Sequence, residues 1–98
     1  MDVRFADAKL DRLEVEAAYS AGFSQSIISA FRKRMQQIRA AADERDFYHL
    51  KSLHFEKLEG DQSHQRSIRL NKQWRLVIEI EGNAPKKTVV IIGIEDYH

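Results

Sequence analysis

The chain has 98 residues, of which 43% are hydrophobic and 32% charged, and its formal net charge is +1. This length predicts one domain over residues 1–98 with a single core, which excludes an enzyme with separate cofactor and substrate lobes. The absence of cysteine excludes a disulfide framework, a thiolate zinc site and a cysteine nucleophile, and no apolar run approaches the roughly 20 residues that span a bilayer, so we expect a cytoplasmic protein.

Two helices are predicted in the first half of the chain. The first runs from about Asp7 to Ser20, ends before Gly22, and repeats apolar residues at helical spacing: Leu10, Leu13 and Ala17. The second begins after a cap at Ser24 or Ser26 and has one apolar face: Ile27, Phe31, Met35, Ile38 and Ala42.

Two further features belong to this half. Asp43 and Asp46 resemble a capping pair, which predicts a short third helical turn. The basic run Arg32-Lys33-Arg34 falls on the outward face of the second helix and is interpreted as a solvated surface.

Beyond Gly60 the hydrophobic period changes from 3.6 to 2. The runs 67–71 and 74–81 alternate apolar and polar residues, which predicts two half-buried antiparallel strands. The run 88–94 is apolar at nearly every position and predicts a central strand covered on both faces, and a short strand is expected near residues 3–5. We therefore predict an α+β domain with two to three N-terminal helices packed on one face of a small, mainly antiparallel sheet of three to four strands.

The register of the first hairpin follows from burial. A three-residue loop at 71–73 places apolar residues opposite one another, namely Leu70 opposite Trp74 and Ile68 opposite Leu76. The same register sets Arg69 opposite Arg75, a like-charge pair that costs about 0.2–1 kcal/mol. Two interpretations remain open: an anion binds between the arginines, or their side chains spread into water toward carboxylates such as Glu79.

The last three residues, Asp96, Tyr97 and His98, are all candidates for proton transfer. If the final strand continues to the end, Asp96 and His98 share a face, and the carboxylate favours the charged imidazole. Tyr97 then points the other way, so joint action requires the strand to end or twist there. The alternative is a frayed terminus of polar residues in water.

The other histidines and the glycines add no metal or cofactor motif. No histidine pair has the helical spacing of a metal site, and no phosphate loop, dinucleotide fingerprint or serine nucleophile motif occurs, so neither metal nor cofactor is expected. His54 precedes the basic hairpin and lies either on the surface or in a cleft. A basic, aromatic-interleaved strip with acid/base side chains suits RNA cleavage, because RNA carries its own nucleophile, the 2′-hydroxyl.

Five short motifs stand out in the second half of the chain: Leu53-His54, Gly60-Asp61, Ser67-Ile68-Arg69, Gln73-Trp74-Arg75-Leu76 and Asp96-Tyr97-His98. Together they resemble the HigB branch of the RelE/ParE superfamily of bacterial toxins. The resemblance implies a compact RNase-like fold and cleavage of messenger RNA in the ribosomal A site. It also implies neutralisation by a helix-turn-helix antitoxin of the HigA type, which would be the only link to operator DNA.

The resemblance also implies a site. It assigns catalysis to His54, Asp96, Tyr97 and His98, and phosphate or RNA contacts to Lys57, Arg69 and Arg75. The position of the lysine depends on how the motif is counted, since counting from His54 selects Lys57 whereas counting back from Gly60 selects Glu59. A toxin of the ParE branch, which clamps DNA gyrase without catalysis, is the alternative, and a degenerate toxin that survives only as an antitoxin partner is a third possibility.

Overall fold

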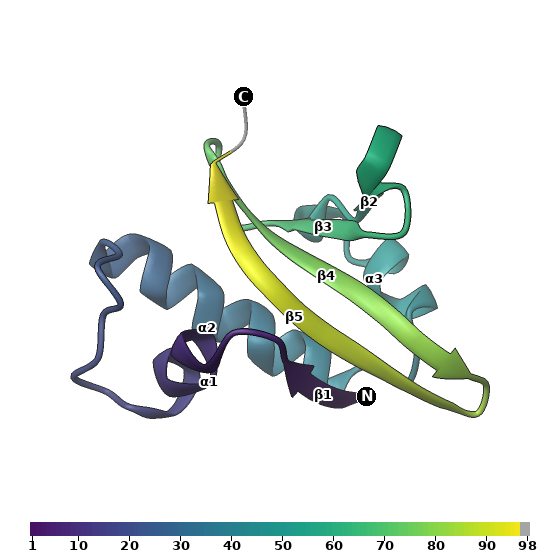
Figure 1. Cartoon of the computed structure of the whole chain (residues 1–98), viewed down its shortest axis with the longest axis horizontal. Helices are drawn as coiled ribbons and strands as arrows, with labels where there is room; N and C mark the ends of the chain where they lie inside the picture. The colour runs from purple at the N-terminus through teal and green to yellow at the C-terminus, as the bar shows by residue number, and fades with distance from the viewer. Residues whose placement is uncertain (97–98) are drawn as a thin grey trace.

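The computed structural model of the chain describes residues 1–96. In chain order the elements are β1 (Asp2–Phe5), α1 (Ala8–Val15), α2 (Gln25–Ala40), α3 (Arg45–His49), the 3₁₀ turn η1 (Lys51–Leu53), β2 (Glu56–Lys57), the 3₁₀ turn η2 (Gly60–Gln62), β3 (Arg66–Arg69), β4 (Trp74–Asn83) and β5 (Lys86–Asp96). The strands form one sheet in the order β1-β5-β4-β3-β2, in which only β1 and β5 run parallel among the described residues (Figure 1). The predicted α+β class is confirmed.

The sheet has one strand more than the sequence predicted. β2 consists of Glu56 and Lys57, both exposed, and pairs with β3 over two residues. A polar pair of this length has no hydrophobic period, so the pattern of the sequence gives no sign of it. β5 lies between β1 and β4, as expected for a strand with an apolar run.

Helix α1 is shorter than predicted. Asp7 caps it by accepting a hydrogen bond from the backbone N–H of Lys9, but the helix ends at Val15 instead of Ser20. The guanidinium group of Arg32 donates to the carbonyl oxygens of Leu13 (2.9 Å) and Glu16 (2.9 Å), and so satisfies the end of the helix. Gly22, with φ +83°, therefore lies in the following loop and not at the helix C-terminus.

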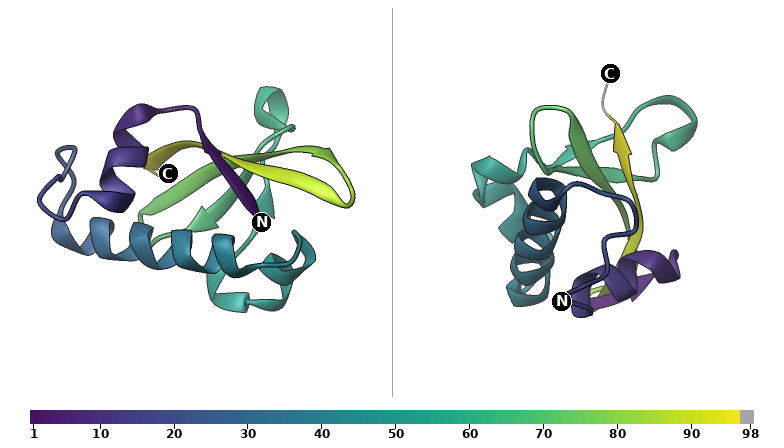
Figure 2. Two further views of the ribbon diagram at one scale, coloured as in Figure 1. Left: turned by 90° about the horizontal axis from the view of Figure 1, so that it is seen from below. Right: turned by 90° about the vertical axis from the view of Figure 1, so that its left-hand side faces the viewer.

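Helix α2 begins where the sequence placed it. The Ser24 side chain caps it by accepting from the N–H of Ile27 (3.4 Å). The helix lies along one face of the sheet, and α1 packs beside it (Figure 2). The short helix α3 confirms the predicted third turn, although Ala42 lies outside the helices and is exposed.

One core joins this helical layer to the sheet. Its largest fully buried side chains come from all three helices, from η1 and from the central strands: Phe31, Phe47, Leu13, Met35, Ile38, Leu53, Ile68, Leu76, Ile78 and Ile91. The radius of gyration is 12.8 Å, which is the value expected of a compact chain of this length. No helix among residues 1–96 is long and apolar enough to cross a membrane.

The register of the first hairpin agrees with the prediction. Ile68 pairs with Leu76 and Arg69 pairs with Arg75, and the N–H of Leu70 donates to the carbonyl of Trp74 (2.9 Å). Because side chains alternate across a strand, the apolar partners face the helices and the two arginines lie on the opposite, open face of the sheet. The fold therefore directs two cations away from the core at adjacent positions.

Candidate active site

A pocket of about 200 Å³ lies at the end of the sheet where β3 turns into β4. The residues that line it are His54, Glu56, Arg69, Asn71, Lys72, Trp74 and Arg75. Three of the predicted site residues, His54, Arg69 and Arg75, thus meet in one place although they come from three separate segments. With Lys72 the pocket holds three permanent cations and one carboxylate, so it favours an anionic ligand.

His54 follows η1 and ends that turn with a left-handed backbone, at φ 45° and ψ 53°. This conformation is unfavourable for a residue with a Cβ atom, because Cβ approaches the following carbonyl oxygen. The side chains of its neighbours Leu53 and Phe55 are buried and hold the segment on both sides. The imidazole of His54 is exposed and lines the pocket. Strained backbone of this kind is concentrated at functional sites.

The imidazole of His54 contacts the guanidinium group of Arg69. The two atoms are His54 Nε2 and Arg69 Nη1, 3.4 Å apart. A guanidinium group has only donors, so in a hydrogen bond between these two atoms the imidazole nitrogen accepts. The contact places an imidazole, a group suited to proton transfer, beside a permanent cation.

Arg69 is held by a second contact, since its Nε donates to the carbonyl of Asn71 (3.1 Å). Its register partner Arg75 is partly buried and lies opposite Glu95 of β5, an opposite charge that partly offsets the like-charge pair. Glu79, the carboxylate expected to attract the arginines, has other partners. It accepts from the side-chain amide of Gln65 (3.0 Å) and lies 3.5 Å from Nε2 of His64.

Asp96 ends β5 beside this pocket but does not line it. It pairs with Trp74, so the alternation of the strand places Glu95, and not Asp96, on the side of Arg75. Its Oδ2 accepts a hydrogen bond from Nε2 of Gln73 (3.1 Å), in the loop that joins β3 to β4. The candidates Tyr97 and His98 lie outside the described residues.

Lys57 is a second predicted site residue that does not line the pocket. In β2, Glu56 pairs with Ser67 and Lys57 pairs with Arg66, so the two side chains point to opposite faces. Glu56 is on the face of Arg69 and lines the pocket, while Lys57 is exposed on the other side. Glu56 was not predicted from the sequence, because the strand that orients its side chain is only two residues long.

The loop of the first hairpin is held by one side chain. Asn71 Oδ1 accepts from the backbone N–H of both Gln73 and Trp74, at 2.8 Å each. This arrangement fixes the turn that carries Lys72 and Trp74 into the pocket wall. An asparagine at the first position of the loop is the signal from which this role could have been predicted.

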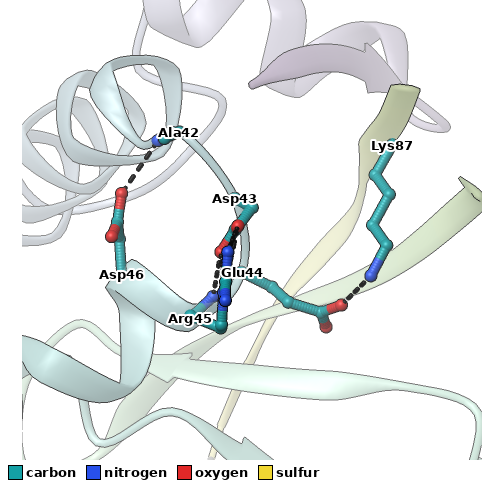
Figure 3. Close-up of polar contacts among 6 residues, drawn as sticks. All are labelled: Ala42, Asp43, Glu44, Arg45, Asp46 and Lys87. Atoms are coloured by element: carbon teal, nitrogen blue, oxygen red, sulfur yellow. Dashed lines mark hydrogen bonds and ion pairs between the residues drawn. The ribbon is translucent and has the colours of Figure 1, made fainter. Parts of the chain in front are cut away.

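A larger cavity, of about 920 Å³, lies at the opposite end of the β4–β5 hairpin and contains none of the predicted site residues. Glu44 of the α2–α3 junction forms an ion pair with Lys87 of β5, and Arg45 pairs with Asp43 inside the junction at 2.7 Å (Figure 3). The same junction is closed by Asp46, which accepts from the N–H of Ala42 (2.8 Å). We assign this region to the support of the hairpin, because Glu44 links the α2–α3 junction to Lys87 of β5.

No group of three or more potential metal ligands is present among residues 1–96. The titrating and charged groups of the pocket are therefore the imidazole of His54, the carboxylate of Glu56 and the cations that surround them. This set can accept a proton and stabilise negative charge on a phosphoryl group.

Comparisons with known proteins bear on the family and the fold of the chain. A family model for the RelE-like toxin of the type II toxin–antitoxin system HigB matches residues 3–98. Among solved structures, the chain is similar to a YoeB/ParE toxin from Agrobacterium tumefaciens, with a TM-score of 0.61 and 15% sequence identity over 100% of both chains. At this identity the likeness concerns the fold alone. No curated protein matches the sequence.

Proposed function

The chain belongs to the RelE-like HigB family of type II toxins, and we propose that it is an endoribonuclease that cleaves messenger RNA in the ribosomal A site without a metal ion. The observation that carries this proposal is the meeting of His54, Arg69 and Arg75 in one pocket on the open face of the sheet. A clamp that acts by protein contact alone would have no use for an imidazole acceptor among cations.

The proposed reaction uses the nucleophile of the RNA itself. A base removes the proton of the 2′-hydroxyl, whose oxygen attacks the adjacent phosphorus, while the bond from phosphorus to the 5′-oxygen of the next nucleotide breaks. An acid protonates that leaving oxygen. The products are a 2′,3′-cyclic phosphate and a 5′-hydroxyl, so no water enters this step.

The roles divide among the residues by their chemistry. Arg69 and Arg75 stabilise the charge that develops on the phosphoryl oxygens. His54 and His98 share the two proton transfers, Asp96 supports the C-terminal imidazole, and Tyr97 shapes the site or donates a proton. Lys57 contributes at most a peripheral phosphate contact, because it faces away from the pocket.

The family also implies a protein partner. Type II toxins are neutralised by an antitoxin, and we propose one of the HigA type with a helix-turn-helix domain, through which alone the complex reaches operator DNA. The other proposed partners are the ribosome and its messenger RNA, which places the activity in the cytoplasm.

The proposal is tested by mapping transcript ends after brief induction of the toxin. New ends within translated codons that depend on Arg75 support it. Intact transcripts together with an SOS response would instead identify the ParE-like alternative, a toxin that acts on gyrase. Expression of Arg75→Ala at the same level provides the control for indirect effects of growth arrest.

A further inference from the structure

Arg34 of α2 lies under the candidate active site, although the sequence analysis interpreted it as part of a solvated basic run. Its side chain is partly buried and donates three hydrogen bonds. Nε donates to the carbonyl of Arg69 (2.9 Å), Nη2 to the carbonyl of Ser52 (3.2 Å) and Nη1 to Oε1 of Gln37 (2.9 Å). The expectation of a solvated face is therefore wrong for this residue.

Two of these acceptors belong to the segments that carry the pocket. Ser52 lies in η1, two positions before His54, and the other carbonyl is that of Arg69 itself. His54 and Arg69 are 15 positions apart in sequence, and the strand pairing between them extends over only the two residue pairs of β2 and β3. The guanidinium group of Arg34 thus joins the backbone of Arg69 to the short segment that leads into His54.

The chemistry of these bonds requires arginine. Nε and Nη2 lie on one edge of a rigid plane, so they hold two carbonyl oxygens at a fixed separation, which the single ammonium group of a lysine cannot do. All three acceptors are neutral oxygens, and burial lowers the pKa of the Arg34 guanidinium. Gln37 fixes the rotation of the group through its third bond.

We infer that Arg34 is a positioning residue that sets the distance between the His54 imidazole and the Arg69 guanidinium. The inference rests on the proposed function, because it assigns a role in the cleavage reaction. Arg34 does not line the pocket, and it acts through the backbone carbonyls of Arg69 and of Ser52, two positions before His54. A displacement of about 1 Å between such groups is enough to lower a rate by about 100-fold.

The same helix supplies a matched control. Arg32 also uses Nε and Nη2 to hold two backbone carbonyls, those of Leu13 and Glu16, at 2.9 Å each, but these belong to the end of α1 and not to the pocket. Arg32→Lys and Arg34→Lys therefore remove the same kind of fork from the same helix. Their effects on stability should be similar, whereas their effects on the site should differ.

The experiment measures cleavage of ribosome-bound messenger RNA by wild type, Arg32→Lys and Arg34→Lys, well below the unfolding temperature of all three proteins. We expect Arg34→Lys to lower kcat at least about 10-fold with little change in KM, and Arg32→Lys to stay within about twofold of wild type. Gln37→Ala, which frees the guanidinium group to rotate without removing it, gives a smaller loss in kcat and replaces Arg34→Lys if that variant does not fold.

A second measurement separates this inference from the proposed function. The ring resonances of His54, assigned with His54→Gln, are recorded by NMR in the same variants without ribosomes. They should move in Arg34→Lys and Gln37→Ala but not in Arg32→Lys. If wild type does not cleave RNA, the proposed function fails while the resonances still decide the positioning role. Equal effects of Arg32→Lys and Arg34→Lys on kcat, or unchanged His54 resonances in Arg34→Lys, would overturn the inference.

Discussion

The backbone of His54 lies in the left-handed region, at φ 45°, which costs a residue with a Cβ atom about 1–2 kcal/mol. Glycine would adopt this conformation without that cost, so the imidazole is present in spite of its effect on stability. The side chain lines the pocket and contacts Arg69. A residue that lowers stability and occupies a cationic pocket is best explained by its chemistry.

Replacement of His54 tests this explanation. We expect His54→Gly to abolish RNA cleavage and to leave the free energy of unfolding unchanged or raise it by up to about 1 kcal/mol, because the strain is released. Ala21, with φ 51°, is the matched control, since Ala21→Gly releases the same kind of strain outside the pocket and should preserve activity. Chemical denaturation and a cleavage assay measure the two effects. Full activity in a folded His54→Gly variant would exclude the imidazole from catalysis.

The arginine pair leads to a second prediction at this scale. Arg75→Ala should lower the rate of cleavage by about 100- to 1,000-fold, because it removes a cation that stabilises the phosphoryl charge. Its effect on the free energy of unfolding should stay within about 1 kcal/mol, since the substitution also removes a like-charge neighbour of Arg69. Arg66→Ala, on the opposite face of β3, is the control and should retain activity. Toxicity of Arg75→Ala equal to that of wild type would refute the site.

At the scale of elements, the features that a hydrophobic pattern marks were predicted correctly, and the others were not. The register of β3 and β4 was predicted correctly because a shift by one residue would have exposed the apolar side chains of both strands. The end of α1 was not predicted correctly, because Arg32 of α2 donates hydrogen bonds to carbonyl oxygens at the end of α1. Lys57 was assigned to the site from motif spacing alone, whereas a two-residue strand turns Glu56 toward the pocket instead.

The junction between α2 and α3 has a charge pair whose contribution depends on pH. The side chain and backbone of Arg45 donate to Asp43 and lower the pKa of its carboxyl from 3.8 to about 2. Since folding lowers this pKa, the carboxylate stabilises the native state fully above 3.8 and loses that contribution as the pH falls through about 2.

Asp43→Asn should therefore lower the unfolding midpoint at neutral pH, and the difference from wild type should shrink between pH 3.8 and about 2. Thermal unfolding of both proteins across this range measures it. A difference that stays constant or grows on acidification would show that the ion pair in Figure 3 does not stabilise the fold.

The end of β5 gives the other prediction at this scale. Deletion of residues 96–98 should abolish cleavage but leave a folded protein, because Asp96 is exposed and its pair with Trp74 is the last of the ladder between β4 and β5, which stays intact up to Glu95. Circular dichroism and the unfolding midpoint report the fold, and growth after induction reports toxicity. Gln73→Ala, which removes the hydrogen bond to Asp96, should give an intermediate loss of activity. A folded truncation that still arrests growth would remove the C-terminal residues from the proposed mechanism.

In the whole molecule, the two faces of the sheet differ: one packs against the helices and the other carries the candidate active site. Its inner face carries the apolar residues that pack against the helices, and its open face carries Arg69 and Arg75 at the end where β3 turns into β4. The larger cavity, with its paired charges, lies at the other end of the β4–β5 hairpin. A pocket in this position is open to a large partner, as an mRNA bound to a ribosome would be.

The site could be predicted from the sequence only in part. His54, Arg69 and Arg75 were identified from motifs and strand alternation, and the structure brings them together. Glu56 and the supporting Arg34 were not identified, because their places depend on contacts between segments distant in sequence, such as the bond from α2 to the backbone of β3. Lys72 was not assigned to the site, although it lies in the hairpin loop that the pattern predicted. No local pattern distinguishes Arg34 from its exposed neighbour Lys33.

The most direct test uses purified protein, purified ribosomes and one defined messenger RNA, with the ends of the products identified chemically. We predict a cut within the codon in the A site that requires the ribosome and leaves a 2′,3′-cyclic phosphate and a 5′-hydroxyl. The cut should persist in the presence of a metal chelator at a concentration that leaves the ribosomes intact, and Arg75→Ala should slow it by about 100-fold or more. Uncut messenger RNA under conditions in which the protein binds the ribosome, or products that carry a 5′-phosphate, would contradict it.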